Sequence, residues 1–93
     1  MNVAIGIYFA PTAMTPEKYD EVMRKLEATG QGAPKGRTYH AAFFEADGLH
    51  VFDVWDSQED FDAFGAVLMP ILTEGGIDPG QPQVAQVHNV VIG

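Results

Sequence analysis

One strand of this chain sets a carboxylate beside its only tryptophan, in the segment EADGLHVFDVWDSQEDF (45–61). Side chains two residues apart on a strand share a face, so Asp53 and Trp55 point the same way. Asp47-Gly48 is a favoured two-residue hairpin turn, and a hairpin closed there sets His40 opposite Trp55 and diagonal to Asp53. A histidine paired with a carboxylate is held in one tautomer and made more basic. It could then take a proton from a phenol or an acidic carbon.

Further candidate residues lie on the same predicted face of the sheet. Tyr8, on a neighbouring strand, would supply a hydroxyl donor, and Trp55 would offer an aromatic ligand a flat apolar wall. Phe44, Gln86 and His88 are the other candidate substrate contacts. Each of these could equally serve packing, and the polar pair could equally fix a subunit interface.

Motifs for other chemistries are absent from the sequence. His40, Asp53 and His88 could imitate a two-histidine, one-carboxylate set, but no H-x-H or H-E-x-x-H motif supports a metal site. Neither predicted helix contains a histidine, which disfavours a helix-borne haem ligand. The chain has no cysteine, no P-loop and no G-x-S-x-G. We therefore expect no metal and no cofactor.

Composition limits the partners that the chain could bind. Its 93 residues predict a single domain over 1–93. Five Lys plus Arg against thirteen Asp plus Glu give a net charge of -8, which disfavours nucleic acid and anionic membrane surfaces. No signal peptide or membrane-spanning run is visible, so a cytoplasmic protein is expected. The content of 46% hydrophobic residues is generous for so short a chain, and it favours a buried subunit interface, hence a homodimer.

Hydrophobic spacing and end signals predict six elements. Strands are expected over 3–10, 37–46, 49–56 and 83–92. Helices are expected after Thr15 and Ser57 as N-caps, ending at Gly30 and Gly75, with Pro70 kinking or shortening the second. Their apolar stripes are Tyr19, Val22, Met23 and Leu26 in the first helix, and Phe61, Phe64, Leu68, Ile71 and Leu72 in the second.

The order β-α-β-β-α-β predicts a ferredoxin-like α+β fold, with a four-stranded antiparallel sheet and two helices on one face. The uniformly apolar set is expected to face the helices: Val3, Ile5, Ile7, Phe9, Ala41, Phe43, Phe52 and Val54. The other face would hold Tyr8, His40, Ala42, Phe44, Val51, Asp53 and Trp55, joined by Gln86 and His88. That second face is too apolar to leave in water, so it should meet a partner.

This order, together with the string HVFDVWDSQEDFDAF (50–64), resembles the dimeric α/β-barrel superfamily, which includes antibiotic biosynthesis monooxygenase-like and EthD-like proteins. The most specific part is VWDS (54–57) followed by aromatic residues at 61 and 64. The resemblance implies that two sheets face each other across a homodimer and close into a barrel. Members of the superfamily carry out many different reactions, so the fold does not choose among them.

Three functions are compatible with this pattern. In a cofactor-independent monooxygenase-like enzyme for a small aromatic or polyketide-like molecule, His40 would be the base, oriented by Asp53. Tyr8 would donate to the developing oxyanion, and Trp55 would stack on the ring. Alternatively, the chain is a non-catalytic small-molecule-binding or structural dimer, or a regulatory module of the ACT type. This enzyme mechanism follows from the hairpin register, and a His40 that points toward the helices would refute it.

Overall fold

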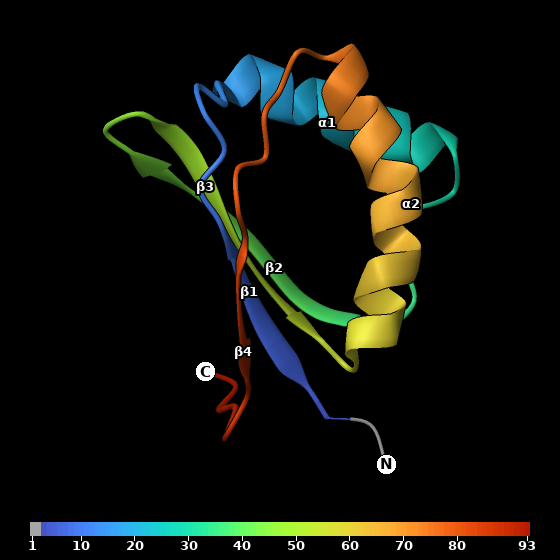
Figure 1. Cartoon of the computed structure of the whole chain (residues 1–93), viewed down its shortest axis with the longest axis vertical. Coiled ribbons are helices and arrows are strands. Elements are labelled where there is room, and N and C mark those ends of the chain that lie inside the picture. The colour runs from blue at the N-terminus through green and yellow to red at the C-terminus, as the bar shows by residue number, and fades with distance from the viewer. Residues whose placement is uncertain (1–2) are drawn as a thin grey trace.

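Two helices cover one face of a four-stranded antiparallel sheet (Figure 1). The computed structural model describes residues 3–93. In chain order its elements are β1 (Ile5–Phe9), α1 (Pro16–Ala28), β2 (Arg37–Glu45), β3 (Gly48–Trp55), α2 (Gln58–Glu74) and β4 (Gln83–Gln86). The strands lie in the order β2-β3-β1-β4, and each pair of neighbours is antiparallel. The predicted ferredoxin-like fold is confirmed.

The helix ends follow the predicted capping residues. The Thr15 hydroxyl accepts from the Lys18 N–H at 3.2 Å, and the Ser57 hydroxyl accepts from the Asp60 N–H at 3.1 Å. Such caps satisfy amides that the first turn of a helix leaves unpaired. Pro70 does not shorten α2, which continues to Glu74. The predicted apolar stripes of both helices pack in or against the core.

The β2–β3 hairpin turns one residue earlier than predicted. Glu45 pairs with Gly48, so the two loop residues are Ala46 and Asp47. Neither has the positive φ that a type I′ turn requires, because Ala13 is the only non-glycine residue with positive φ between residues 3 and 93. Gly48 instead serves close packing: its φ is 129°, and a Cβ there would lie 2.9 Å from the Met14 carbonyl oxygen.

This earlier turn moves the pairing register by two residues, which keeps each side chain on its face of the hairpin. His40 consequently lies directly opposite Asp53 rather than diagonal to it. A β-bulge between Arg37 and Tyr39 then brings Arg37 opposite Trp55. His40, Asp53 and Trp55 therefore share a face, as the sequence predicted.

The face that the hairpin turns toward the helices was predicted wrongly. On β1, Ile7 pairs with Asp53 and Ile5 with Trp55, so the buried residues of β1 lie on the same side as the polar pair. The helices therefore cover the face that holds His40, Asp53, Trp55 and Val51. The residues expected there lie on the open face, the sheet surface away from the helices: Ala41, Phe43, Phe52 and Val54. The enzyme mechanism in the form predicted from the sequence, with His40 away from the helices and Tyr8 beside it, is wrong.

The last strand is shorter than predicted. β4 ends at Gln86, and one further backbone bond joins the Val87 N–H to the Ala4 carbonyl at 2.9 Å. Residues 88–92 leave the sheet, and Val91 and Ile92 are 80% and 86% exposed. Within residues 3–93, no helix has both the length and the apolar character needed to cross a membrane.

Candidate functional site

A hydrogen-bond chain runs through the side of the sheet that the helices cover. Asp53 Oδ1 lies 2.5 Å from His40 Nδ1, and Trp55 Nε1 donates to Asp53 Oδ2 at 3.3 Å. On the other side of the imidazole, Tyr19 Oη lies 2.6 Å from His40 Nε2. Three elements supply these groups: α1 carries Tyr19, β2 carries His40, and β3 carries Asp53 and Trp55.

The protonation states of Asp53 and His40 decide which atom donates in each of these hydrogen bonds. An ionised Asp53 can only accept, so Nδ1 of a neutral His40 carries the proton and donates to it. Nε2 then carries a lone pair and accepts a hydrogen bond from the Tyr19 hydroxyl. The Asp53 side chain is 5% exposed and that of His40 is 18% exposed. The carboxylate is thus enclosed, while solvent reaches the imidazole.

Tyr19 is suited to remain a neutral donor. Burial raises the pKa of Tyr19 above its ordinary value of 10.0, Arg37 opposes that rise, and the nearby Asp53 and Asp20 charges add to it. The Tyr19 and His40 rings are nearly parallel, at 10° with centroids 6.0 Å apart. At neutral pH the phenol therefore keeps the proton that it donates to His40.

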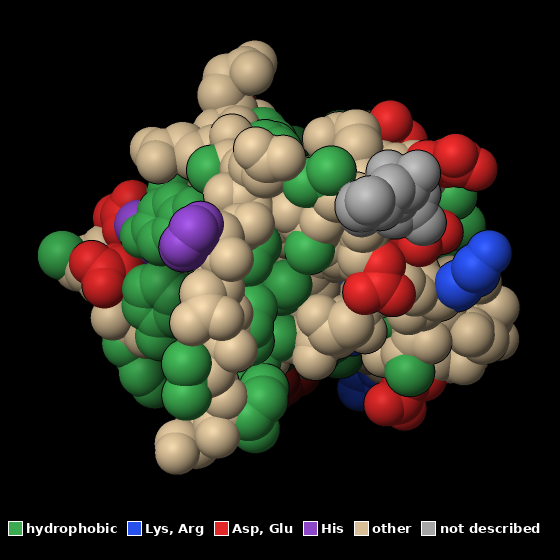
Figure 2. Space-filling model, turned by 90° about the horizontal axis from the view of Figure 1, so that it is seen from below, with side chains coloured by type: hydrophobic (Ala, Val, Ile, Leu, Met, Phe, Trp, Pro, Cys, Tyr) green, Lys and Arg blue, Asp and Glu red, His purple; other side chains and the backbone are tan. Residues whose placement is uncertain are grey.

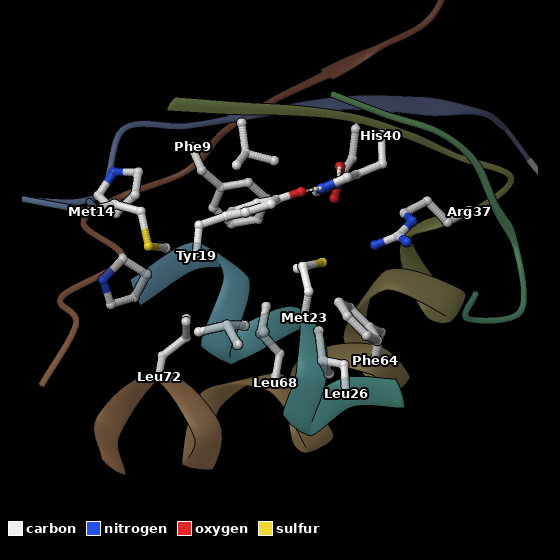
Figure 3. Close-up of a pocket in the computed structure, with 15 residues that line it drawn as sticks. Phe9, Met14, Tyr19, Met23, Leu26, Arg37, His40, Phe64, Leu68 and Leu72 are labelled. Atoms are coloured by element: carbon white, nitrogen blue, oxygen red, sulfur yellow. Dashed lines mark hydrogen bonds and ion pairs between the residues drawn. The ribbon is translucent and has the colours of Figure 1, made fainter. Parts of the chain in front are cut away.

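The Tyr19–His40–Asp53 hydrogen bonds lie on the sheet side of an almost wholly apolar cavity between the sheet and the helices (Figure 3). The cavity holds about 60 Å³ of space open to the centre of a water molecule. Its polar lining is Tyr19, Arg37, His40 and Asp53, and its apolar lining is Phe9, Pro11, Met14, Val22, Met23, Leu26, Val51, Phe64, Leu68, Leu72 and Pro79. An apolar cavity with a few convergent polar groups is the usual form of a small-molecule site.

Trp55 does not line the cavity as a stacking wall. It is fully buried and packs against Phe61 and Phe64, with ring centroids 5.6 and 5.3 Å away. Its indole N–H instead helps to hold the Asp53 carboxylate. Trp55 therefore acts behind the site, as a residue that positions Asp53.

The other predicted site residues lie away from His40, so the prediction of one shared cavity is wrong for them. Tyr8 is on the open face, where its hydroxyl lies 2.6 Å from His50 Nδ1. Gln86 and His88 line an open-face groove of about 520 Å³ together with Tyr8. Phe44, near the hairpin tip, is 78% exposed. Tyr8 lies on the open face as predicted, and the reversed hairpin separates it from His40, which faces the helices instead.

Tyr19 and Arg37 are the cavity residues that sequence reasoning missed. Tyr19 belongs to the apolar stripe of α1, and its hydroxyl was the only sign of a polar role. Arg37 reaches the cavity only through the bulge beside it, because regular alternation would put it on the face of Tyr39. No simple sequence pattern predicts such a bulge.

The open-face groove is larger than the cavity, yet its polar residues are more exposed and less suited to catalysis. Between residues 3 and 93, no group of three or more His, Asp or Glu side chains could hold a metal ion. Gln83, Ala85, Gln86 and His88 in the groove are exposed. The cavity beneath the helices is therefore the stronger candidate for a catalytic site.

Comparison with solved structures gives the fold class. SnoaB, a cofactor-independent oxygenase from Streptomyces nogalater, matches with a TM-score of 0.68 and 16% identity, over 96% of this chain and 97% of that one. A candidate antibiotic biosynthesis monooxygenase from Chloroflexus aurantiacus matches with a TM-score of 0.62 and 18% identity, over 97% and 99% of the two chains. The chain has the fold of the antibiotic biosynthesis monooxygenase-like proteins. The resemblance predicted from the sequence is confirmed at the level of fold.

A monooxygenase candidate from Shewanella loihica matches similarly, with a TM-score of 0.60 and 18% identity over 97% of this chain and 99% of that chain. No protein-family profile and no curated protein matches the chain. Because the identities are low, these structures establish the fold and leave the reaction to be argued from the site.

Proposed function

We propose that this protein is a cofactor-independent monooxygenase-like enzyme that takes a proton from a small phenol or enolisable ketone. The observation that carries the proposal is the position of His40 at an apolar cavity, with Asp53 at Nδ1 and the Tyr19 hydroxyl at Nε2. The description of SnoaB as a cofactor-independent oxygenase supports the same reaction class.

The proton step uses the direction of the hydrogen-bond chain. Asp53 fixes the Nδ1–H tautomer, so Nε2 faces the cavity as the base. A bound substrate would take the place of the Tyr19 hydroxyl at Nε2, and Asp53 would stabilise the imidazolium that forms. The displaced Tyr19 hydroxyl then becomes a donor for the developing oxyanion, which is the role predicted for Tyr8.

The oxygen step then needs no outside reductant. An activated methylene that loses its two hydrogens to oxygen becomes a carbonyl: CH₂ plus O₂ gives C=O plus H₂O. The substrate supplies all the electrons, one oxygen atom enters the product, and the other leaves as water. The protein contributes the proton transfer and a cavity poor in water.

Cavity size limits the substrate. Space of about 60 Å³ would hold about four to six water molecules, at about 10–15 Å³ of such space for each. A small β-dicarbonyl unit is therefore the better first probe. A ring would require side chains to move, and the unbranched Met14 and Met23 that line the cavity are the most adaptable ones.

A second candidate function is binding without turnover, and one feature favours it. Both ring nitrogens of His40 are already engaged, by Asp53 and Tyr19. The cavity could then hold a ligand while the polar chain only stabilises the fold.

Deuterium exchange distinguishes these two functions. Acetylacetone has acidic methylene protons, and NMR in deuterated water follows their enzyme-dependent exchange. We expect His40→Gln to lower that rate by about a hundredfold or more, the usual contribution of a positioned base. His88→Gln is the matched control, because His88 is exposed and lies outside the cavity. Equal rates for His40→Gln and the unmodified protein would support binding without catalysis.

The proposal includes a homodimer that covers the open face. Figure 2 shows hydrophobic side chains gathered on the sheet side of the molecule. Tyr39 is 52% exposed and Phe52 36% exposed on this face, and the apolar residues Val90, Val91 and Ile92, which follow β4, are exposed as well. Native mass spectrometry tests this part, and a monomeric mass would contradict it.

A further inference from the structure

Arg37 brings a positive charge to a cavity whose other polar lining residues are Tyr19, His40 and Asp53. It is the only Lys or Arg in the cavity lining. Among residues 3–93, the ion pairs involve Arg24, Lys25, His40 and His50, and none involves Arg37. The Asp53 carboxylate lines the same cavity, but it is paired with His40, so the partly buried guanidinium has no carboxylate in direct contact among residues 3–93. Such a group is prepared for an anionic ligand.

A backbone irregularity aims Arg37 at this cavity. The bulge between Arg37 and Tyr39 inserts one extra residue into β2, which places Arg37 opposite Trp55 on the helix-covered face. Without it, Arg37 would share the open face with Tyr39. Bulges recur beside active sites, where they redirect side chains.

The contacts of Arg37 hold its side chain and leave donors free. Its Nη2 donates to the Gly32 carbonyl at 3.2 Å, and its guanidinium carbon lies 5.7 Å from the centre of the Phe64 ring. A guanidinium has five N–H donors in a flat fork that matches a carboxylate. Figure 3 shows the side chain reaching in beneath His40 toward Met23.

We infer that Arg37 binds an anionic oxygen of the ligand, so that the cavity takes a small carboxylic acid with an acidic hydroxyl or methylene near the carboxylate. A β-keto acid fits this description. The inference that the ligand has an acidic hydroxyl or methylene rests on the proposed function, because that group would face His40. The anionic group rests on Arg37 alone.

The spacing of the two residues suits one small molecule. Arg37 pairs with Trp55 and His40 with Asp53, so the two attachment points are two pairing positions apart, about 6–7 Å along the strand. Asp53 forms its ion pair with His40 and not with Arg37, and its second oxygen accepts from Trp55. A carboxylate on Arg37 therefore leaves the acidic end of the ligand toward the imidazole.

Two probes of matched shape test this inference. Acetoacetate and acetylacetone differ in that a carboxylate replaces an acetyl group, so the difference in their binding reports the charge. We expect the protein to bind acetoacetate about tenfold or more tightly than acetylacetone, measured by calorimetry or by NMR shifts of Tyr19. Arg37→Met should abolish that preference and Arg37→Lys should keep part of it. Arg24→Met, an exposed arginine of α1, should leave it unchanged.

The outcomes separate the two proposals. Equal binding of both probes, a preference that survives in Arg37→Met, or no binding of either probe overturns the role of Arg37. A preference lost in Arg37→Met but kept in His40→Gln supports the anion site, whatever the exchange rate of His40→Gln proves to be. Circular dichroism confirms that Arg37→Met is folded, and the Lys variant gives a second readout if it is not.

Discussion

Replacing Asp53 with asparagine should reverse the direction of the hydrogen-bond chain. The carboxylate now accepts from His40 Nδ1 at 2.5 Å and from the Trp55 indole at 3.3 Å. An asparagine side chain has one oxygen, which can serve the indole, and an NH₂ group that can only donate. His40 Nδ1 must then become an acceptor, so its proton moves to Nε2 and the Tyr19 hydroxyl turns to accept it.

The energetic cost should be moderate, because every partner can be satisfied again. Hydrogen bonds to a charged group are about twice as strong as neutral ones, so Asp53→Asn should cost about 1–3 kcal/mol. For a chain of this size, each kcal/mol lowers Tm by about 4–8 °C. Asp53→Ala should cost more, since it leaves two buried N–H donors without an acceptor. Thermal unfolding of the two variants measures this order.

The effect on proton transfer should be far larger than the effect on stability. In Asp53→Asn, the nitrogen that faces the cavity carries a proton and cannot act as a base. We expect methylene exchange to fall by about a hundredfold or more, as in His40→Gln. Nitrogen-15 NMR reads the tautomer directly, and His50→Gln and His88→Gln identify the signals among three histidines. A His40 that stays protonated on Nδ1 in Asp53→Asn, or exchange that continues unchanged, would refute this account.

Two further changes test the elements around the site. Burial raises the pKa of Tyr19, so one of the three tyrosines should ionise above the ordinary value in an ultraviolet titration, and Tyr19→Phe should remove that step. The stability from this shift is complete below about pH 10 and falls as pH rises through the folded-state pKa, so Tyr19→Phe should flatten the alkaline loss in denaturation series. Gly48→Ala should cost about 1–3 kcal/mol, because Gly48 has a φ of 129° and a Cβ there would press on the Met14 backbone. Urea titration measures it, and a cost no greater than that of Gly65→Ala, where a Cβ meets open space, would contradict the close-packing argument.

The sequence predicted which hairpin residues share a face, but neither their partners across the hairpin nor the face that the helices cover. A two-residue change of register leaves each side chain on its face, so the predicted contact between His40 and Asp53 forms, although directly across the hairpin rather than diagonally. The choice of face rested on burying the more apolar side. Because both faces are largely apolar, that rule could not decide. The structure buries Asp53 because His40 and Trp55 satisfy both of its oxygens.

The two cavity residues that were missed show different limits of sequence patterns. Tyr19 occupies a core position of α1, and only the reversed hairpin brings His40 beneath it. Arg37 depends on a one-residue bulge that changes the alternation of β2 locally. Helix caps and apolar stripes were predictable because they follow from neighbouring residues. These two positions follow from contacts between elements.

A second Tyr–His–Asp chain in the same hairpin shows what distinguishes the proposed site. On the open face, Tyr8 Oη lies 2.6 Å from His50 Nδ1, and His50 Nε2 lies 2.8 Å from Asp47 Oδ1. The Asp47 side chain is 64% exposed, so water weakens its hold on the imidazole.

The hydrogen-bonded set beneath the helices, Tyr19, His40 and Asp53, has the same three residue types. Its carboxylate is enclosed, and the set borders an apolar cavity that is also lined by Arg37. If residue types alone made a site, the two chains should support exchange equally. If enclosure and the adjacent cation matter, His40→Gln should lower the exchange rate by about a hundredfold or more, and His50→Gln should leave it unchanged. The hairpin thus contains its own internal control, because the two histidines differ in environment far more than in hydrogen-bonding partners.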